Sequence, residues 1–138
     1  MSEVHGTFHI DLTPDEAEVD GAITRMSFEK RWSGGLSGSS RGVFLSAGDP
    51  ESGSAGYVVA EVFHGSLAGR FGSFQFLQLG TMTDGQADLT YIVAPGSGNG
   101  ELEGITGLLS LDVVDGEHRY RLTHNLTPLP QAEEPDAR

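Results

Sequence analysis

The feature that most constrains this chain is a short-period alternation of apolar and polar residues that recurs along most of the sequence. Such alternation is typical of strands buried on one face, because successive strand side chains point to opposite sides of a sheet. Glycines are spread between the alternating windows and mark turns. The pattern predicts eight strands, near residues 5–12, 22–33, 39–47, 56–67, 71–82, 86–93, 106–113 and 118–126.

The breaks between these predicted strands are short, which favours antiparallel pairing of consecutive strands. The Asp84-Gly85 and Asp115-Gly116 pairs are typical of tight hairpins. Eight strands can form a sandwich or a barrel, and alternation alone does not separate the two. Closure removes exposed strand edges, so we predict an all-β fold: a single eight-stranded antiparallel barrel, a lipocalin-like meander.

Three segments depart from the strand pattern. Residues 13–18 begin with threonine, proline and acidic residues, which could open one turn of helix. Residues 48–56 are rich in glycine and serine and predict a longer hairpin loop. Residues 127–138 are acidic and proline-rich and predict a disordered tail, which leaves residues 1–126 as the barrel domain.

The charge of the chain restricts its partners. The chain has twenty aspartate and glutamate residues and eight lysine and arginine residues, which gives a net charge of −12. This balance argues against binding to nucleic acid, whose affinity depends on neutralising phosphates, and disfavours anionic membrane surfaces. No cysteine is present, which excludes disulfides and thiolate metal sites. We see neither a signal peptide nor a run near the ~18 apolar residues of a membrane helix, so a cytoplasmic protein is the default expectation.

The glycine-rich run and the histidines are the candidate motifs for a cofactor or a metal. The glycine-rich run 96–100 lacks the lysine and the helix of a phosphate-binding loop, so it is interpreted as a structural turn. The five histidines show neither the helical pairing nor the carboxylate spacing of a metal site. The sequence therefore predicts no cofactor and no metal.

Two blocks of the sequence carry a family resemblance. His64 to Phe74, followed by Leu79-Gly80-Thr81-Met82, and the run from Val93 to Gly107 match one pattern in order and spacing. On the basis of these blocks, the chain resembles an uncharacterised bacterial family, a domain of unknown function with an allene oxide cyclase-like barrel. The resemblance covers residues 5–126. The resemblance implies a small barrel that binds a hydrophobic molecule, without implying the same product. Gln78 and His124 depart from the family pattern, where a histidine and an aromatic residue are more usual.

Glu61 is the candidate catalytic residue. It shares a strand face with Tyr57, Val59 and Phe63, which makes it the carboxylate most surrounded by apolar side chains on its own strand face. Burial would favour a protonated carboxyl group that donates to a substrate oxygen, whereas a nearby Arg41 or Arg70 would favour the carboxylate. A purely structural ion pair with one of these arginines is the competing interpretation.

Other strand faces combine apolar residues with a few polar tips, as a ligand-lined lumen requires. The predicted substrate-binding residues are Trp32, Tyr57, Phe74, Phe76, Gln78, Tyr91, Tyr120 and His124.

Three functions are compatible with such a barrel. The leading hypothesis is a cofactor-independent cyclase or isomerase whose lumen holds a mainly apolar or amphipathic small molecule in a reactive conformation. A non-catalytic carrier of hydrophobic ligands is the alternative, and a packed structural module is the third. Residues 56–63 are apolar on both faces, which predicts a homo-oligomer, with a homodimer favoured.

Overall fold

A computed structural model describes residues 1–127, except for the side chains of residues 16–18. It is almost entirely β-structure, in nine strands and one short 3-10 helix. The elements are β1 (Ser2–Val19), β2 (Ile23–Gly34), β3 (Leu36–Asp49), η1 (Pro50–Ser52), β4 (Ser54–Leu67), β5 (Arg70–Thr83), β6 (Gln86–Val93), β7 (Asn99–Gly100), β8 (Thr106–Val114) and β9 (Glu117–Asn125).

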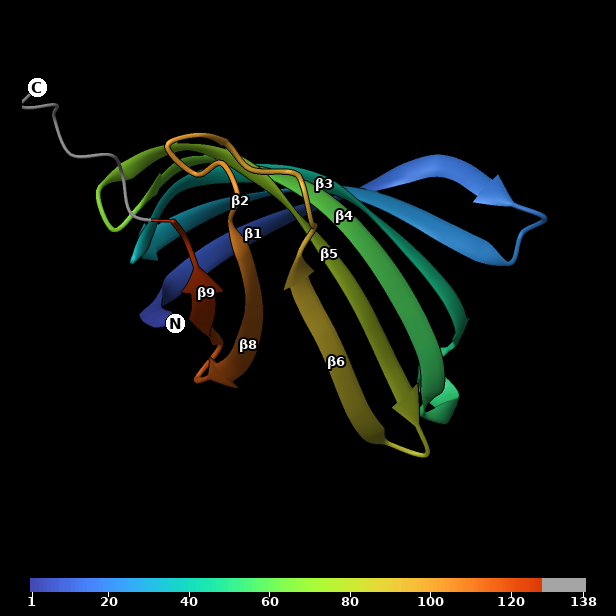
Figure 1. Cartoon of the computed structure of the whole chain (residues 1–138). Coiled ribbons are helices and arrows are strands. Elements are labelled where there is room, and N and C mark those ends of the chain that lie inside the picture. Colours follow the sequence, from blue (N-terminus) through green and yellow to red (C-terminus); the bar gives the residue numbers. More distant parts are fainter. Residues whose placement is uncertain (128–138) are drawn as a thin grey trace, which may run out of the picture.

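Eight of these strands close into one antiparallel barrel, in the order β1-β2-β3-β4-β5-β6-β8-β9, with β9 paired back to β1 (Figure 1). The short β7 is an addition that pairs with β5. Closure follows from the long alternating strands and from hairpins tight enough to return each strand beside the last. The predicted all-β, eight-stranded barrel is confirmed.

Three of the hairpins are two-residue turns whose central residues both have positive φ. This is the geometry of a type I′ turn, which matches the twist of the strands it joins. Asp84-Gly85 and Asp115-Gly116 are the Asp-Gly pairs that the sequence indicated, and Ala68-Gly69 forms the third.

The wall of the barrel has one weak seam. β3 and β4 pair along their whole lengths, from Leu36 opposite Leu67 to Asp49 opposite Ser54. By contrast, β6 and β8 share one paired position, Ile92 opposite Leu108, and the two strands diverge from there (Figure 1).

The helical turn expected at residues 13–18 is absent, because β1 continues as a strand to Val19. Pairing with β2 continues with a register shift between Pro14 and Glu18. The Asp15 carboxylate accepts hydrogen bonds from Arg25 Nε at 3.0 Å and Ser27 Oγ at 2.9 Å, both on β2. Hydrogen bonds to a neighbouring strand override the local helical preference here.

The loop expected at residues 48–56 is also shorter than predicted. β3 runs to Asp49 and β4 begins at Ser54, so only the 3-10 turn and Gly53 lie between them. Asp49 caps this turn by accepting a hydrogen bond from the Glu51 amide. The predicted tail lies outside the described residues from position 128 onward.

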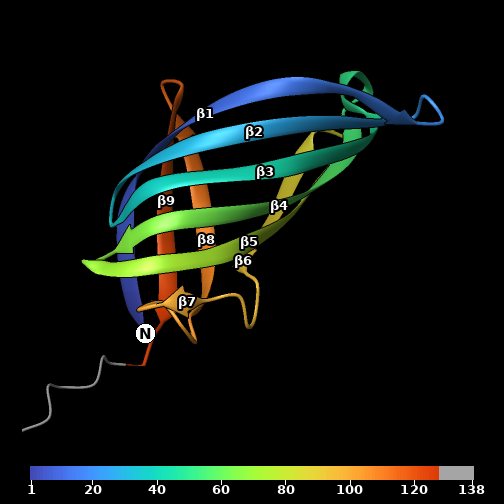
Figure 2. The same ribbon diagram turned by 90° about the horizontal axis from the view of Figure 1, so that it is seen from above.

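One end of the barrel is filled by a packed core of aromatic and aliphatic side chains. Trp32 lies at its centre, with its ring 5.0 Å from Tyr120 and 5.6 Å from Phe76 between centroids. The segment that carries β7 crosses this end, as Figure 2 shows, and contributes the buried Leu102 and Ile105. That end is therefore closed, and any internal space lies toward the other end.

Candidate functional site

Lys30 is a lysine buried inside the barrel. It alternates along β2 with Phe28 and Trp32, so its side chain points inward, and only 3% of it is exposed. Its Nζ donates hydrogen bonds to Glu61 Oε1 at 3.0 Å and to the Tyr91 hydroxyl at 2.9 Å. Lysine is almost never buried unless paired, and here the pairing is with a carboxylate.

Glu61 lies on β4 and is also fully inside, with 2% exposed. Its Oε1 accepts a short hydrogen bond of 2.6 Å from the Tyr91 hydroxyl, in addition to the bond from Lys30. The Gln78 amide nitrogen approaches the same oxygen at 3.4 Å. Lys30, Glu61 and Tyr91, hereafter the polar cluster, thus connect β2, β4 and β6 across the lumen.

The second carboxylate oxygen is held from the other side. Ser40 Oγ on β3 donates to Glu61 Oε2 at 2.7 Å and itself accepts from Trp32 Nε1 at 2.9 Å. Both oxygens of Glu61 are therefore engaged in hydrogen bonds with buried side chains.

The ion-pair partner of Glu61 is Lys30, not Arg41 or Arg70 as the sequence suggested. Arg41 neighbours the inward Ser40 and so points outward, where its Nε bonds Glu29 at 3.1 Å. Arg70 donates to the carbonyl oxygen of Glu101 at 2.8 Å. The alternation of Phe28, Lys30 and Trp32 would have identified the correct partner, because it places a lysine on an apolar face.

Aromatic rings surround the ammonium group of Lys30. Its Nζ lies 4.6 Å from the ring centre of Phe8, 5.0 Å from Phe28, 5.2 Å from Tyr91 and 5.4 Å from Trp32. Each distance is within the range of cation–π attraction, which strengthens when water is excluded.

Burial sets the protonation behaviour of the cluster. Desolvation lowers the pKa of Lys30, against the attraction of Glu61 and the hydrogen bond between them. Desolvation also raises the pKa of Tyr91 well above its ordinary value, and the negative charge of Glu61 adds to this. Tyr91 therefore stays a protonated hydrogen-bond donor across the physiological pH range.

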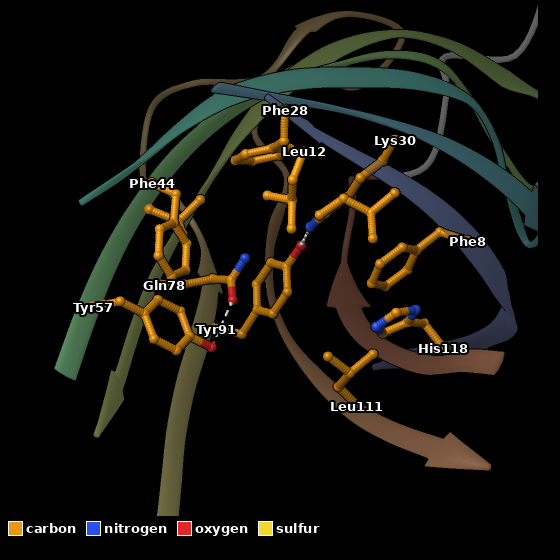
Figure 3. Close-up of a pocket in the computed structure, with 12 residues that line it drawn as sticks. Phe8, Leu12, Phe28, Lys30, Phe44, Tyr57, Gln78, Tyr91, Leu111 and His118 are labelled. Carbon is orange, nitrogen blue, oxygen red and sulfur yellow. Dashed lines mark hydrogen bonds between the residues drawn. The ribbon is translucent and has the colours of Figure 1, made fainter. Parts of the chain in front are cut away.

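A pocket of about 150 Å³ adjoins the polar cluster (Figure 3). Its polar lining consists of Lys30, Tyr57, Gln78, Tyr91 and His118, and its remaining walls are apolar. The apolar lining residues are Phe8, Ile10, Leu12, Phe28, Phe44, Val59 and Leu111.

A second, larger cavity of about 630 Å³ lies beside the first, toward the unfilled end. The two share Phe44, Tyr57 and Leu111 in their walls. The rings of Phe44 and Tyr57 stack with centroids 4.7 Å apart and so form part of the boundary. The larger cavity is also lined by Leu89 of β6 and Val113 of β8, where these two strands diverge. Small-molecule sites commonly occupy about 300–1,000 Å³, a range that the larger cavity falls within.

The predicted site residues fall into two groups. Tyr57, Gln78 and Tyr91 line the pocket, and Glu61 lies directly behind Tyr91 and Lys30. The others pack in the closed end and are not among the residues that line the pocket: Trp32, Phe74, Phe76, Tyr120 and His124. Tyr120 has a structural partner there, because its hydroxyl donates to the Ser33 carbonyl at 2.9 Å and accepts from the Leu36 amide at 2.8 Å.

His124 is different from its neighbours in the closed end. It is 6% exposed, and its Nδ1 has no hydrogen-bond partner among the described residues. Burial lowers the pKa of His124, so the ring is neutral at physiological pH.

Sequence reasoning missed Lys30 and several apolar lining residues, including Phe8, Phe44 and Leu111. Phe8 and Leu111 lie on predicted strands with the required alternation, but alternation does not say at which height of the barrel a cavity opens. Within residues 1–127 there is no group of three or more histidine, aspartate or glutamate residues arranged to hold a metal. The same residues contain no helix long and apolar enough to cross a membrane.

The fold and the site define a small antiparallel β-barrel that is packed at one end and encloses a mainly apolar pocket with a buried lysine, glutamate and tyrosine. The chain belongs to the DUF3224 family, described as proteins of unknown function, whose profile matches residues 4–124. Among solved structures it is similar to a protein of unknown function of this family from Shewanella oneidensis MR-1. The two chains are 41% identical and superpose with a TM-score of 0.85, covering 93% of this chain and 98% of the other. A comparison with curated proteins gave no match.

Proposed function

We propose that this protein binds a mainly apolar small molecule in its barrel and acts on it as a cofactor-independent cyclase or isomerase. The observation that carries the proposal is the position of the polar cluster, which meets the apolar pocket through Lys30 and Tyr91. An apolar wall with a few convergent polar groups is the usual composition of a small-molecule site.

The reaction would rely on shape and on electrostatics. Apolar walls hold a flexible substrate in a folded conformation, which lowers the entropic part of the barrier. The Lys30 ammonium and the Tyr91 hydroxyl are buried donors at the wall of the pocket, and they stabilise negative charge that develops on a substrate oxygen. Glu61 exchanges protons with the substrate through Tyr91, whose hydroxyl lies 2.6 Å away.

The resemblance to allene oxide cyclase-like barrels supports this choice of reaction class. The resemblance implies a small barrel that binds a hydrophobic molecule, and the mainly apolar walls of the pocket suit such a ligand. Fold similarity says nothing about the substrate, so the identity of the molecule must come from binding experiments.

A non-catalytic carrier is the second candidate, and one observation favours it. Glu61 does not itself line the pocket, and both of its oxygens already have partners. In a carrier, the Glu61 carboxylate would have a positioning role: it would fix Lys30 and Tyr91 as hydrogen-bond donors to a bound ligand.

The experiment is a panel of lipids, terpenoids and polyketide-like compounds, tested for binding by calorimetry and for conversion by product analysis. Glu61→Gln preserves size while removing acid–base function, and Glu29→Gln, on the outside of β2, is the matched control. Conversion that is lost in Glu61→Gln, with binding retained, supports an enzyme. Binding without conversion in the wild-type protein supports a carrier, and the absence of binding across the panel contradicts both functions.

A further inference from the structure

Lys30 is the only lysine of the 138-residue chain, and it lies inside the barrel at the wall of the pocket. Stability alone does not account for an ion pair there, because buried ion pairs can often be replaced by apolar residues of similar volume without loss of stability. A primary amine next to a cavity is, in addition, a nucleophile toward carbonyl carbon once it loses a proton.

We propose that Lys30 forms a reversible imine with the carbonyl group of a small apolar aldehyde or ketone held in this pocket. The inference rests on the proposed binding function and deepens it, because it names a class of ligand and a covalent step.

The hydrogen bonds of Lys30 Nζ leave one of its bonding directions free for attack on a carbonyl carbon. Its oxygen partners, Glu61 and Tyr91, take two of its three N–H directions, and no other oxygen acceptor bonds it among the described residues. When the amine is neutral it keeps two N–H bonds for these partners, so its lone pair takes the third direction. Because Lys30 lines the pocket, a carbonyl group bound there lies against its side chain.

The cluster can also move the protons that imine formation requires. Glu61 Oε1, 3.0 Å from Nζ, takes one proton from the ammonium group, and rotation about the Cε–Nζ bond turns the freed lone pair away from Glu61. The amine attacks the carbonyl carbon, and a second proton passes from nitrogen to the carbonyl oxygen, giving a neutral carbinolamine. Glu61 then returns its proton through Tyr91 to the hydroxyl group, which leaves as water while the C=N bond forms.

The charges balance in this sequence of steps. One ammonium and one carbonyl compound give one protonated imine and one water, and the carboxylate of Glu61 is regenerated beside the positive charge. Desolvation of Lys30 lowers the pKa of its amine and so assists the first proton transfer.

Charge and space select the class of ligand. The positive charge of Lys30 is already matched by Glu61, so a ligand carboxylate in the pocket would leave one negative charge buried without a partner. A neutral carbonyl compound avoids this cost. Its carbonyl end fits the pocket of about 150 Å³, and an apolar tail can extend past Phe44 and Tyr57 into the cavity of about 630 Å³.

The test is reductive trapping of the full-length protein with octanal or benzaldehyde and sodium cyanoborohydride, followed by intact-mass and peptide analysis. The expected result is one adduct at Lys30, formed faster than any adduct at the N-terminal α-amine of the chain. Lys30→Arg keeps the charge without an available lone pair and should lose the adduct at position 30 completely. The wild-type peptide analysis gives the same information should this variant not fold.

Three further variants separate the role of the Lys30 amine from the roles of the residues around it. Glu61→Gln should slow trapping at Lys30 by about 10²-fold or more, because acid–base assistance is removed. Glu29→Gln, on the outer face of the strand that carries Lys30, should leave the trapping rate unchanged. Tyr91→Phe tests the same proton transfer, because it removes the hydroxyl group through which Glu61 returns its proton.

Binding of octan-1-ol and benzyl alcohol, which have no carbonyl group, is measured in parallel by amide chemical shifts. If the alcohols shift residues of the pocket but neither aldehyde is trapped at Lys30, the imine inference is wrong and the proposed binding function stands. If neither alcohol nor aldehyde binds, the proposed function is contradicted and the inference falls with it.

Discussion

The Tyr91 hydroxyl and Glu61 Oε1 lie 2.6 Å apart and connect β6 to β4 inside the barrel. β6 has a full ladder only on its β5 side, because it shares a single paired position with β8. This side-chain bond, together with the bond from Lys30 to the same hydroxyl, therefore helps to hold β6 at the seam.

We expect Tyr91→Phe to lower the free energy of unfolding by about 1–3 kcal/mol, because it removes one buried hydrogen-bond partner from Glu61 and one from Lys30. Tyr57→Phe is the matched control, since its half-buried hydroxyl makes only a long bond of 3.5 Å to Gln78. Urea unfolding followed by fluorescence measures both variants. Equal losses in the two would show that the Tyr91 hydroxyl has no special role.

The Lys30–Glu61 pair provides a second prediction about stability. Lys30→Met leaves Glu61 buried without its cation and should cost about 3–5 kcal/mol. Adding Glu61→Leu should recover part of that loss, because no buried charge is then left alone. A double-mutant cycle measures the coupling, and Arg41→Ala, which breaks the exposed Arg41–Glu29 pair, should cost less than about 1 kcal/mol. A double variant less stable than either single variant would contradict this account.

The barrel itself could be predicted from the sequence because its determinants are local: alternating strands and Asp-Gly hairpins such as Asp84-Gly85. Parity also placed Glu61, Tyr57 and Tyr91 inside. What could not be predicted was position along the barrel axis, which separates Tyr91, at the pocket, from Tyr120, in the closed end. The position of a residue along the barrel axis depends on the stagger of all eight strands and on the segment that fills one end. The pairing of Lys30 with Glu61 was missed for a simpler reason, since the inward alternation of β2 was followed only through its aromatic residues.

The three tyrosines provide a prediction about pH. Burial raises the pKa of Tyr57, Tyr91 and Tyr120 above the ordinary value of 10.0. Above pH 10 the unfolded chain loses phenol protons that the folded protein keeps, so the folded state binds more protons and the free energy of unfolding falls as pH rises. Lys30, whose pKa is lowered, acts in the opposite sense, but only up to its ordinary value of 10.5.

Phenolate absorbance measured against pH checks this account. Native protein should develop less phenolate than urea-unfolded protein at the same pH above 10, and the remaining signal should appear together with unfolding. Coincident titration curves for the two states would contradict it.

An exposed apolar surface on β4 and β5 supports the proposed homodimer. Val58 pairs with Leu79 and Ala60 with Leu77 across these strands, and Val58, Leu77 and Leu79 are between 43% and 50% exposed. Extended apolar patches of this kind often mark interfaces between proteins. Light scattering at high micromolar concentration should give about twice the mass of 14.6 kDa for the wild-type chain.

The variant Leu77→Glu/Leu79→Glu should give the monomer mass. Val19→Glu, at a similarly exposed position near the β1–β2 turn, should leave the dimer intact and is the control. A wild-type protein of monomer mass would contradict the proposed dimer.

Access to the pocket depends on Phe44. Its ring stacks on Tyr57 at 4.7 Å, and both residues border the inner pocket and the larger cavity. Removing the ring in Phe44→Ala widens the passage between the two spaces, so an apolar probe such as octan-1-ol should reach the inner pocket faster. Stopped-flow fluorescence of Trp32, the only tryptophan, follows binding because its indole lies 5.4 Å from Lys30 Nζ. Phe71→Ala removes a ring that is 67% exposed and should leave the association rate unchanged. If Phe44→Ala also leaves it unchanged while the probe still binds, the ligand enters by a route that does not pass Phe44, and the larger cavity is not the entrance.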